Sequence, residues 1–281
     1  MEEKMKSEGK CLFCEKTFTK TGIHRHLATH LKEKMAKGSP GKSFFVTVET
    51  SKRRAATPYF LCLWIDGKTE FETLDRYLRD IWLECCNHNG EFRKKQDGRI
   101  KSEKNLIISK LMAEDRVEEA MRYISLNYFD GSDEISIYNE ANDIFKKGVV
   151  LDYEFGYGFA YNFGDPTFLN ITVIEEYPVA ADSEIILLSR NEPLAIICRS
   201  CGKIPAKQMC VACLGHRDAF FCDNCANEHA KTCRFFKDDA AALPVVNSPR
   251  MGKCKYKGGK IDKERDGVFI GCKNGSIRKN N

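Results

Sequence analysis

The sequence lacks any long apolar run. No stretch of its 281 residues approaches the roughly 18–20 apolar residues that cross a bilayer, so we expect no contact with a membrane. The first ten residues contain no apolar segment of the kind found in secretory signals. The 14 cysteines fall mostly in metal-type pairs and not in a secreted disulfide framework. These absences together predict a protein of the reducing cytoplasm.

Recognisable catalytic patterns are missing as well. No nucleophile stands beside an identifiable base. Zinc deaminases combine H-x-E with P-C-x-x-C, and this combination does not occur. We therefore expect a non-enzymatic protein, and we rank an enzyme built around His88 behind two binding functions.

The densest chemical signal lies between residues 198 and 233. This segment contains three C-x-x-C pairs followed by one H-x-x-x-C pair. The side chains are Cys198, Cys201, Cys210, Cys213, Cys222, Cys225, His229 and Cys233. Each C-x-x-C turn presents two thiolates to one ion, and zinc takes four Cys or His ligands. The segment therefore predicts two closed zinc sites of the structural kind, with no open position for catalysis.

The order in which these four pairs combine is open between two arrangements. Neighbouring pairs could share an ion, which gives two consecutive zinc ribbons. Alternatively, the first pair joins the third and the second joins the fourth, which gives a cross-braced module. We favour cross-bracing because the gaps between the pairs are too short for independent units. The runs CRSCGK and FCDNCANEHAKTC resemble the MYND finger and, less closely, the B-box. This resemblance implies a surface for a protein partner.

A second metal motif occupies residues 11–30. Cys11 and Cys14 form a C-x-x-C pair, while His26 and His30 stand one helical turn apart and share one face of a predicted helix. The pattern resembles the two-Cys-two-His zinc finger, with one residue fewer than usual between the second Cys and the first His. Together with the two sites above, it brings the expected number of zinc ions to three.

This finger is poorly equipped to read DNA. The positions that would face bases are Thr19, Gly22 and Arg25, and only Arg25 can make a bidentate contact to guanine. A single finger also covers only about 3 base pairs. We expect a structural, RNA-binding or protein-binding role for it.

Charge is distributed unevenly along the chain. Residues 1–56 carry 13 Lys and Arg against 6 Asp and Glu, and residues 250–281 carry 10 against 3, so each end has a formal charge of +7. The body between them carries 22 against 31, which gives −9. The basic ends could contact phosphate backbones, although Lys-rich termini are also common as solvated segments. Nucleic acid is not expected across the acidic body.

The middle of the chain predicts an α+β fold, a central domain of mixed sheet and helix flanked by small zinc-stabilised modules. Alternating apolar residues predict strands. We expect them at 43–49, 59–65, 149–155, 159–163, 167–176 and 185–189. A stripe at Leu74, Leu78, Ile81 and Trp82 predicts an amphipathic helix with Thr73 as its N-cap. Further helices are expected at 105–126 and 135–147.

Three segments of the chain resemble a known family. They are LDRYLRDIWLECCNHNGEF (74–92), YNFGDPTFLNITVIEEY (161–177) and LPVVNSPRMGKCKYKGG (243–259). They are similar to the plasmid open-reading-frame-three-like proteins of the Ri-plasmid type, also labelled insertion-element passenger proteins. Asn162 stands where that family often has Asp. The resemblance implies an α+β fold and an association with mobile elements, and it implies no activity.

Other cysteine and histidine residues lie outside the predicted ligand sets, and five of them could be read as further ligands. Cys85, Cys86 and His88 show only three ligands, and the predicted helix places Cys85 near its buried stripe, so we favour core packing over chemistry. Cys254 and Cys272 lie 18 residues apart and do not define a site by themselves.

We divide the chain into four parts. Residues 1–37 form the finger with a basic arm, 43–190 the α+β domain with a variable insert at 93–148, 196–236 the MYND-like two-zinc module, and 237–281 a basic tail. The expected function is a zinc-binding adaptor for a protein partner. The alternative is a nucleic-acid-binding protein of mobile elements that uses the basic finger and tail.

Overall fold

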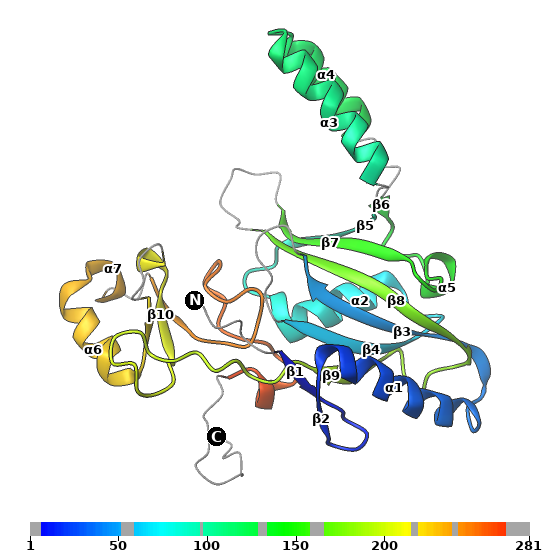
Figure 1. The fold of residues 1–281 in the computed structure, drawn as a ribbon, viewed down its shortest axis with the longest axis horizontal. Helices are drawn as coiled ribbons and strands as arrows, with labels where there is room; N and C mark the ends of the chain where they lie inside the picture. Colours follow the sequence, from blue (N-terminus) through cyan, green and yellow to red (C-terminus); the bar gives the residue numbers. More distant parts are fainter. Residues whose placement is uncertain are drawn as a thin grey trace.

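The centre of the protein is a seven-stranded antiparallel sheet with the strand order β6-β5-β7-β8-β3-β4-β9 (Figure 1). The computed structural model describes residues 7–51, 59–95, 98–128, 134–157, 166–214, 219–237 and 241–267. The strands are β3 (Pro40–Thr50), β4 (Phe60–Asp66), β5 (Asn89–Lys94), β6 (Glu134–Ile135), β7 (Val150–Tyr157), β8 (Thr167–Val179) and β9 (Ile185–Arg190). Together with the helices that pack on it, the sheet confirms the predicted α+β class.

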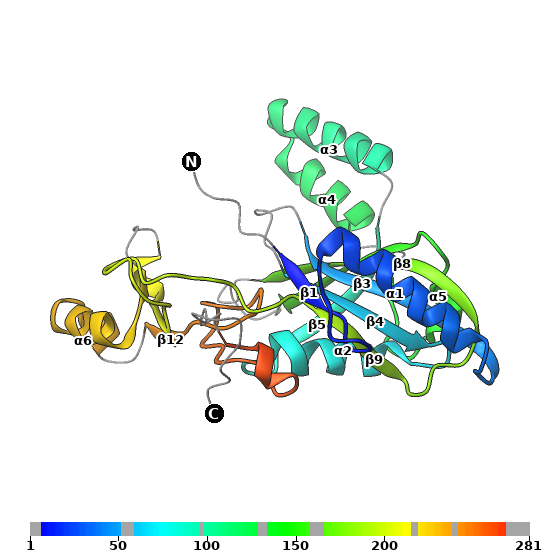
Figure 2. The same ribbon diagram turned by 60° about the horizontal axis from the view of Figure 1, so that its bottom comes forward.

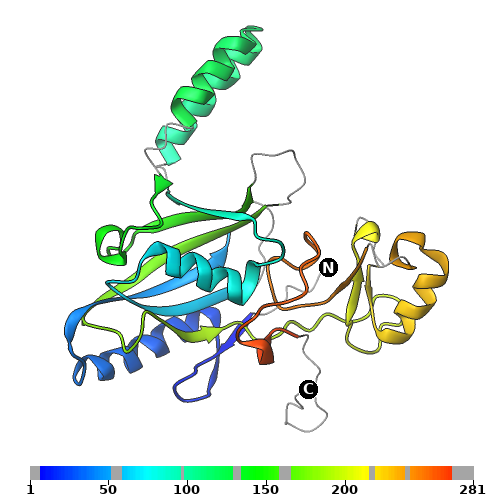
Figure 3. The ribbon, with the colours of Figure 1, turned by 180° about the vertical axis from the view of Figure 1, so that it is seen from behind.

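Strand β4 is buried on both faces of the sheet. Its odd-numbered positions, such as Leu63, belong to one apolar cluster, and its even-numbered positions, such as Trp64, belong to another. Successive side chains of a strand point to opposite faces, so two layers must cover this strand. Figures 2 and 3 show these layers as helix α1 on one side and helix α2 on the other.

Helix α2 (Phe71–Leu78) continues into a π-helical turn, η2 (Arg79–Leu83). Together they cover the face of the sheet that carries the odd-numbered residues of β4, such as Leu63. The predicted stripe from Leu74 to Trp82 is buried there. The helix begins earlier than expected, with Glu70 and not Thr73 at its N-cap. Two of its first backbone N–H groups donate to the carbonyls of Ile137 and Asn139. Those carbonyls take the place of side-chain caps at this helix terminus.

The prediction of a helix at 135–147 is therefore wrong for most of that range. Only the short helix α5 (Ala141–Ile144) forms there, after strand β6. The carbonyls of Ile137 and Asn139 are turned towards α2 and cannot also serve a helix of their own. The predicted strand at 159–163 lies outside the described residues.

A helical hairpin stands away from the sheet (Figure 1). It consists of α3 (Gly98–Ala113) and α4 (Val117–Tyr128), where one helical region was predicted at 105–126. Asp115, in the left-handed conformation with φ 57°, separates the two helices. Among the helices of the described ranges, none is long and apolar enough to cross a membrane.

A second, smaller unit lies at one end of the molecule (Figures 1 and 3). Its three-stranded sheet has the order β11-β10-β12, with β10 (Gln208–Cys210), β11 (Phe220–Phe221) and β12 (Ala242–Pro244). Helices α6 (Asp223–Thr232) and α7 (Arg234–Lys237) complete it. Strand β12 follows the expected module boundary at 236, so the chain returns through this small sheet before it leaves the unit.

Much of the segment 245–267, expected as part of a basic tail, lies against the sheet domain, while Val245 and Met251 pack in an apolar cluster of the smaller unit. Asn247, Ser248 and Arg250 are buried. Arg190, at the end of β9, donates to the Asn247 carbonyl and forms ion pairs with Asp262 and Asp266. Residues 268–281 of the predicted tail, including Cys272, lie outside the described residues.

Candidate metal centres

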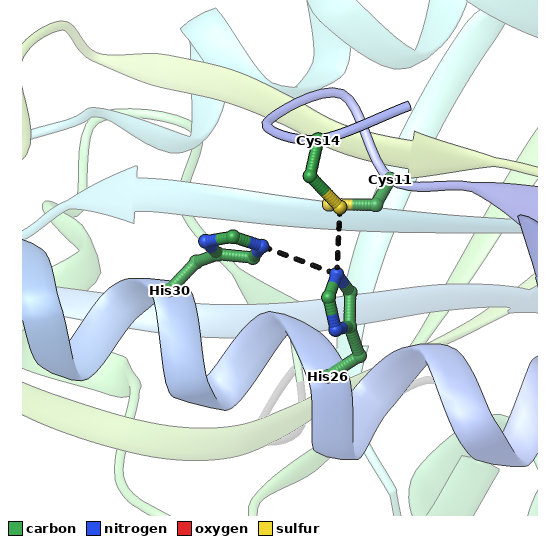
Figure 4. Close-up of side chains that lie close together, drawn as sticks. All are labelled: Cys11, Cys14, His26 and His30. Atoms are coloured by element: carbon green, nitrogen blue, oxygen red, sulfur yellow. Dashed lines mark hydrogen bonds between the residues drawn. The ribbon is translucent and has the colours of Figure 1, made fainter. Parts of the chain in front are cut away.

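The N-terminal finger brings its four predicted ligands together. Cys11 and Cys14 lie in the turn between β1 (Glu8–Lys10) and β2 (Thr17–Thr19), and His26 and His30 project from α1 (Lys20–Met35) (Figure 4). The four ligand atoms all lie within 4.8 Å of one another. In a tetrahedral site with Zn–S bonds of about 2.3 Å, neighbouring ligand atoms lie about 3.8 Å apart. The finger thus has the geometry of a closed site with two cysteine and two histidine ligands.

Local structure explains why these ligands converge. Glu15 adopts φ 62° and donates its N–H to the Cys11 carbonyl, which closes the turn that carries both thiols. Thr19 caps α1 through a hydrogen bond from the Gly22 N–H to its hydroxyl. The helix start is therefore fixed, and His26 and His30 face the turn one helical turn apart.

The surroundings of His26 favour its neutral imidazole form. Burial and the neighbouring His30 lower the pKa of His26, and Phe18 stacks on its ring at 4.2 Å. A neutral imidazole is the form that binds a metal. His24 points to the other side of the helix, where its ring contacts Phe45 on the sheet, so it is not a substitute ligand.

The first site of the module combines Cys198 and Cys201 with Cys222 and Cys225. Burial alone would raise the pKa of the Cys198 thiol, but hydrogen bonds from the backbone N–H groups of Cys201, Cys222 and Ser200 contribute to lowering it to about 6. Backbone N–H groups that point at a sulfur stabilise the thiolate, which is the form that binds a metal. This group is a four-cysteine site.

The second site of the module combines Cys210 and Cys213 with His229 and Cys233. The Cys213 Sγ lies 3.7 Å from His229 Nε2, and the Cys210 Sγ lies 3.9 Å from the Cys233 Sγ. The His229 ring is stacked on Phe221 at 4.3 Å, which fixes its orientation. This group has three cysteines and one histidine, with distances close to those of a zinc tetrahedron.

The two groups interleave along the chain. The first pair of cysteines meets the third pair, and the second meets the Cys–His pair, which is the cross-braced order favoured from the sequence. The arrangement follows from the small sheet, because β10 pairs with β11 and brings the second pair of ligands alongside the third. Neither site can form without the chain segments of the other.

A fourth group was missed in the sequence. Cys85, Cys86 and His88 lie with Cys254, and their ligand atoms are also within 4.8 Å of one another. Cys85 packs against the core as expected, yet its thiol also belongs to this group. No spacing rule connects residues so far apart in the chain, so only the fold reveals the set. The described residues thus hold four groups that could bind metal, where the sequence predicted three.

Comparisons of the chain with protein-family models, with curated proteins and with solved structures give no match. The resemblances found in the sequence therefore remain predictions, and the metal-ligand geometry is the firmest guide to what the protein does.

Proposed function

We propose that the protein is a zinc-dependent interaction protein whose cross-braced module binds a protein partner. The observation that carries this proposal is that the module stands at one end of the molecule and leaves large apolar side chains exposed. They are Ile197, Ile204, Leu214 and Phe235.

The ligand sets support a structural role for the metal. Thiolate and imidazole ligands in a tetrahedral arrangement favour zinc over harder cations. Catalytic zinc sites keep one position for water or substrate, whereas each set here supplies four protein ligands. The ions of the module would accordingly hold its shape and leave recognition to its surface.

The exposed apolar residues supply the means of recognition. Phe235 in α7 is 62% exposed, although its neighbour Phe236 is buried against the second zinc site. Aromatic side chains are enriched at the centres of protein interfaces because they remove large apolar areas from water. A rigid zinc-stabilised unit presents such a residue at little cost in conformational entropy.

The experiment compares partner capture by three forms of the full zinc-loaded chain. The wild type, Phe235→Ser and Leu106→Ser are each incubated with nuclease-treated lysate of the source cells, and bound proteins are quantified by mass spectrometry. Leu106, 71% exposed on the distant hairpin helix α3, is the matched control. We expect a set of proteins that falls at least about tenfold with Phe235→Ser and is retained with Leu106→Ser, because interface hot spots contribute about 2 kcal/mol or more.

Equal capture by all three forms would contradict the proposal. The alternative of nucleic-acid binding, drawn from the basic ends, predicts a different result. In that case the full chain binds mixed DNA or RNA, and log K falls steeply with log salt. If the chain binds nucleic acid in this way, if Phe235→Ser leaves that binding unchanged, and if no protein partner is captured, the nucleic-acid function replaces the adaptor. We propose a reducing cytoplasm as the location of the protein for either function. An association with mobile elements belongs to the nucleic-acid alternative.

A further inference from the structure

The group formed by Cys85, Cys86, His88 and Cys254 joins two distant parts of the chain. The first three residues follow the π-helical turn η2, and Cys254 belongs to the C-terminal segment at 245–267. The His88 Nε2 lies 3.0 Å from both the Cys86 and Cys254 sulfurs, and these two sulfurs lie 3.3 Å apart. Cys85 Sγ lies 3.8 Å from Cys86 Sγ.

We propose that these four side chains bind a fourth zinc ion, which fastens the C-terminal segment to the sheet domain. The set has the same composition, three cysteines and one histidine, as the second site of the module, and the same 4.8 Å limit between its ligand atoms. This proposal does not depend on the identity of the partner of the module.

The backbone around the site is held in unusual conformations that present the ligands. Cys254 and the following Lys255 both have positive φ, at 45° and 57°, and so does Asn87, at 59°. A non-glycine residue in this region costs free energy and persists where its surroundings require it. Here the conformations place Cys254 against Cys86 and His88. Binding of one ion by Cys254, Cys86 and His88 together would offset the free-energy cost of these conformations.

The loop that carries the first three ligands is braced from outside. Glu84 accepts a hydrogen bond from the Asn87 N–H at 2.6 Å, and its other carboxylate oxygen accepts one from Arg79 at 3.2 Å. The turn between Cys85 and His88 is therefore fixed independently of a metal. A preformed turn of this kind is what a metal site with adjacent cysteines requires.

The charge around the group fits a bound zinc ion. Three thiolates and one divalent cation leave a single net negative charge. The Arg250 guanidinium lies 3.5 Å from Cys85 Sγ and 4.9 Å from the centre of the Phe155 ring. Arg250 is itself buried. A buried cation beside a site of net charge −1 balances that charge.

The ion would act as a clasp on a segment that already makes polar contacts with the domain. Ser248 donates to the Trp82 carbonyl at 2.7 Å, and Lys253 donates to the Pro166 carbonyl at 2.8 Å. Since β12 of the module precedes this segment directly, fixing the segment also fixes the point at which the module joins the domain. The orange segment runs between the module and the domain in Figure 3.

The test counts zinc ions in the full chain by native mass spectrometry after purification under reducing conditions. We expect four ions in the wild type and three in Cys86→Ser and in Cys254→Ser. Cys62→Ala is the control, because Cys62 is a cysteine of the sheet core outside all four groups, and this variant should retain four ions. Cys86 is exposed, so Cys86→Ser should fold even if Cys254→Ser does not.

A second measurement tests the clasp itself. Hydrogen exchange of residues 245–267 should increase in Cys86→Ser while exchange in β3 and β4 stays unchanged. Three zinc ions in the folded wild type would overturn the proposal, as would four ions in both Ser variants. A disulfide between Cys86 and Cys254 in the freshly reduced protein, with three ions bound, would also overturn it. None of these results bears on whether Phe235 binds a partner, so the two proposals fail separately.

Discussion

At the scale of single residues, Arg190 is the polar side chain on which the C-terminal segment depends. It is 0% exposed, and its guanidinium forms ion pairs with Asp262 and Asp266 at 3.2 and 2.9 Å. Burial raises the pKa of Asp266, and the charge of Arg190 opposes that rise. A buried ion pair that loses one partner leaves a charge without compensation. The arginine therefore favours the ionised form of Asp266 against the opposing effect of burial.

We expect Arg190→Gln to lower the free energy of unfolding by about 3–5 kcal/mol at neutral pH. The measurement is urea unfolding of the zinc-loaded chain, followed by the fluorescence of Trp64 and Trp82, the two tryptophans of the sequence. Because the folded-state pKa of Asp266 is raised, the loss should shrink as the pH falls through that value and the carboxyl group becomes neutral. Arg116→Gln is the control, since Arg116 pairs with Glu114 and Glu119 on an exposed surface. Equal effects of both variants would show that Arg190 has no special role.

Among the elements, helix α1 links the finger to the sheet. Its buried residues Ile23, Leu27 and Leu31 pack in the same cluster as Phe45 and Trp64. In the structure they cover the second face of the sheet, which explains why β4 is apolar at every position from 60 to 65. The finger is consequently part of the core of the domain.

Leu27→Ala should therefore destabilise the sheet domain as well as the finger. Leu27 is fully buried, and truncation of a buried leucine typically costs about 2–5 kcal/mol. The urea midpoint reported by Trp64 should fall accordingly. Leu106→Ala, the same substitution on the exposed face of α3, should leave the midpoint where it is. If the finger were an independent unit, Leu27→Ala would abolish its zinc binding without moving the tryptophan signal.

The sequence predicts an element well where its own residue pattern determines it, and poorly where contacts with a distant segment determine it. The strands at 43–49, 59–65, 167–176 and 185–189 form where apolar residues predict them, since their pattern reflects burial along one strand. The helix at 135–147 fails because α2 captures the carbonyls of Ile137 and Asn139, a contact between segments. Likewise, the C-x-x-C spacing predicts the ligands of the finger and the module. Only the fold adds Cys254 to Cys85, Cys86 and His88.

For the whole molecule, the two units differ in what holds them together. The sheet domain has two large apolar clusters, one on each face of the sheet. The module has two small ones, centred on Phe221 and on Met209, and relies on its interleaved ligand sets. Units of about 40 residues or fewer seldom fold without a metal or disulfides. Metal removal should therefore affect the two units unequally.

We expect a strong chelator to unfold the module and leave the central sheet folded. Hydrogen exchange with mass spectrometry would report rapid exchange in β10 and α6 together, because the sites are cross-braced and neither set survives the loss of the other. Strands β3 and β4 should keep their protection, since the larger apolar cluster, on the α2 face of the sheet, contains no ligand of the finger or of the module. Added zinc should restore protection in β10 and α6. Simultaneous exposure of β4 and β10 at one chelator concentration would show instead that zinc stabilises a single cooperative unit.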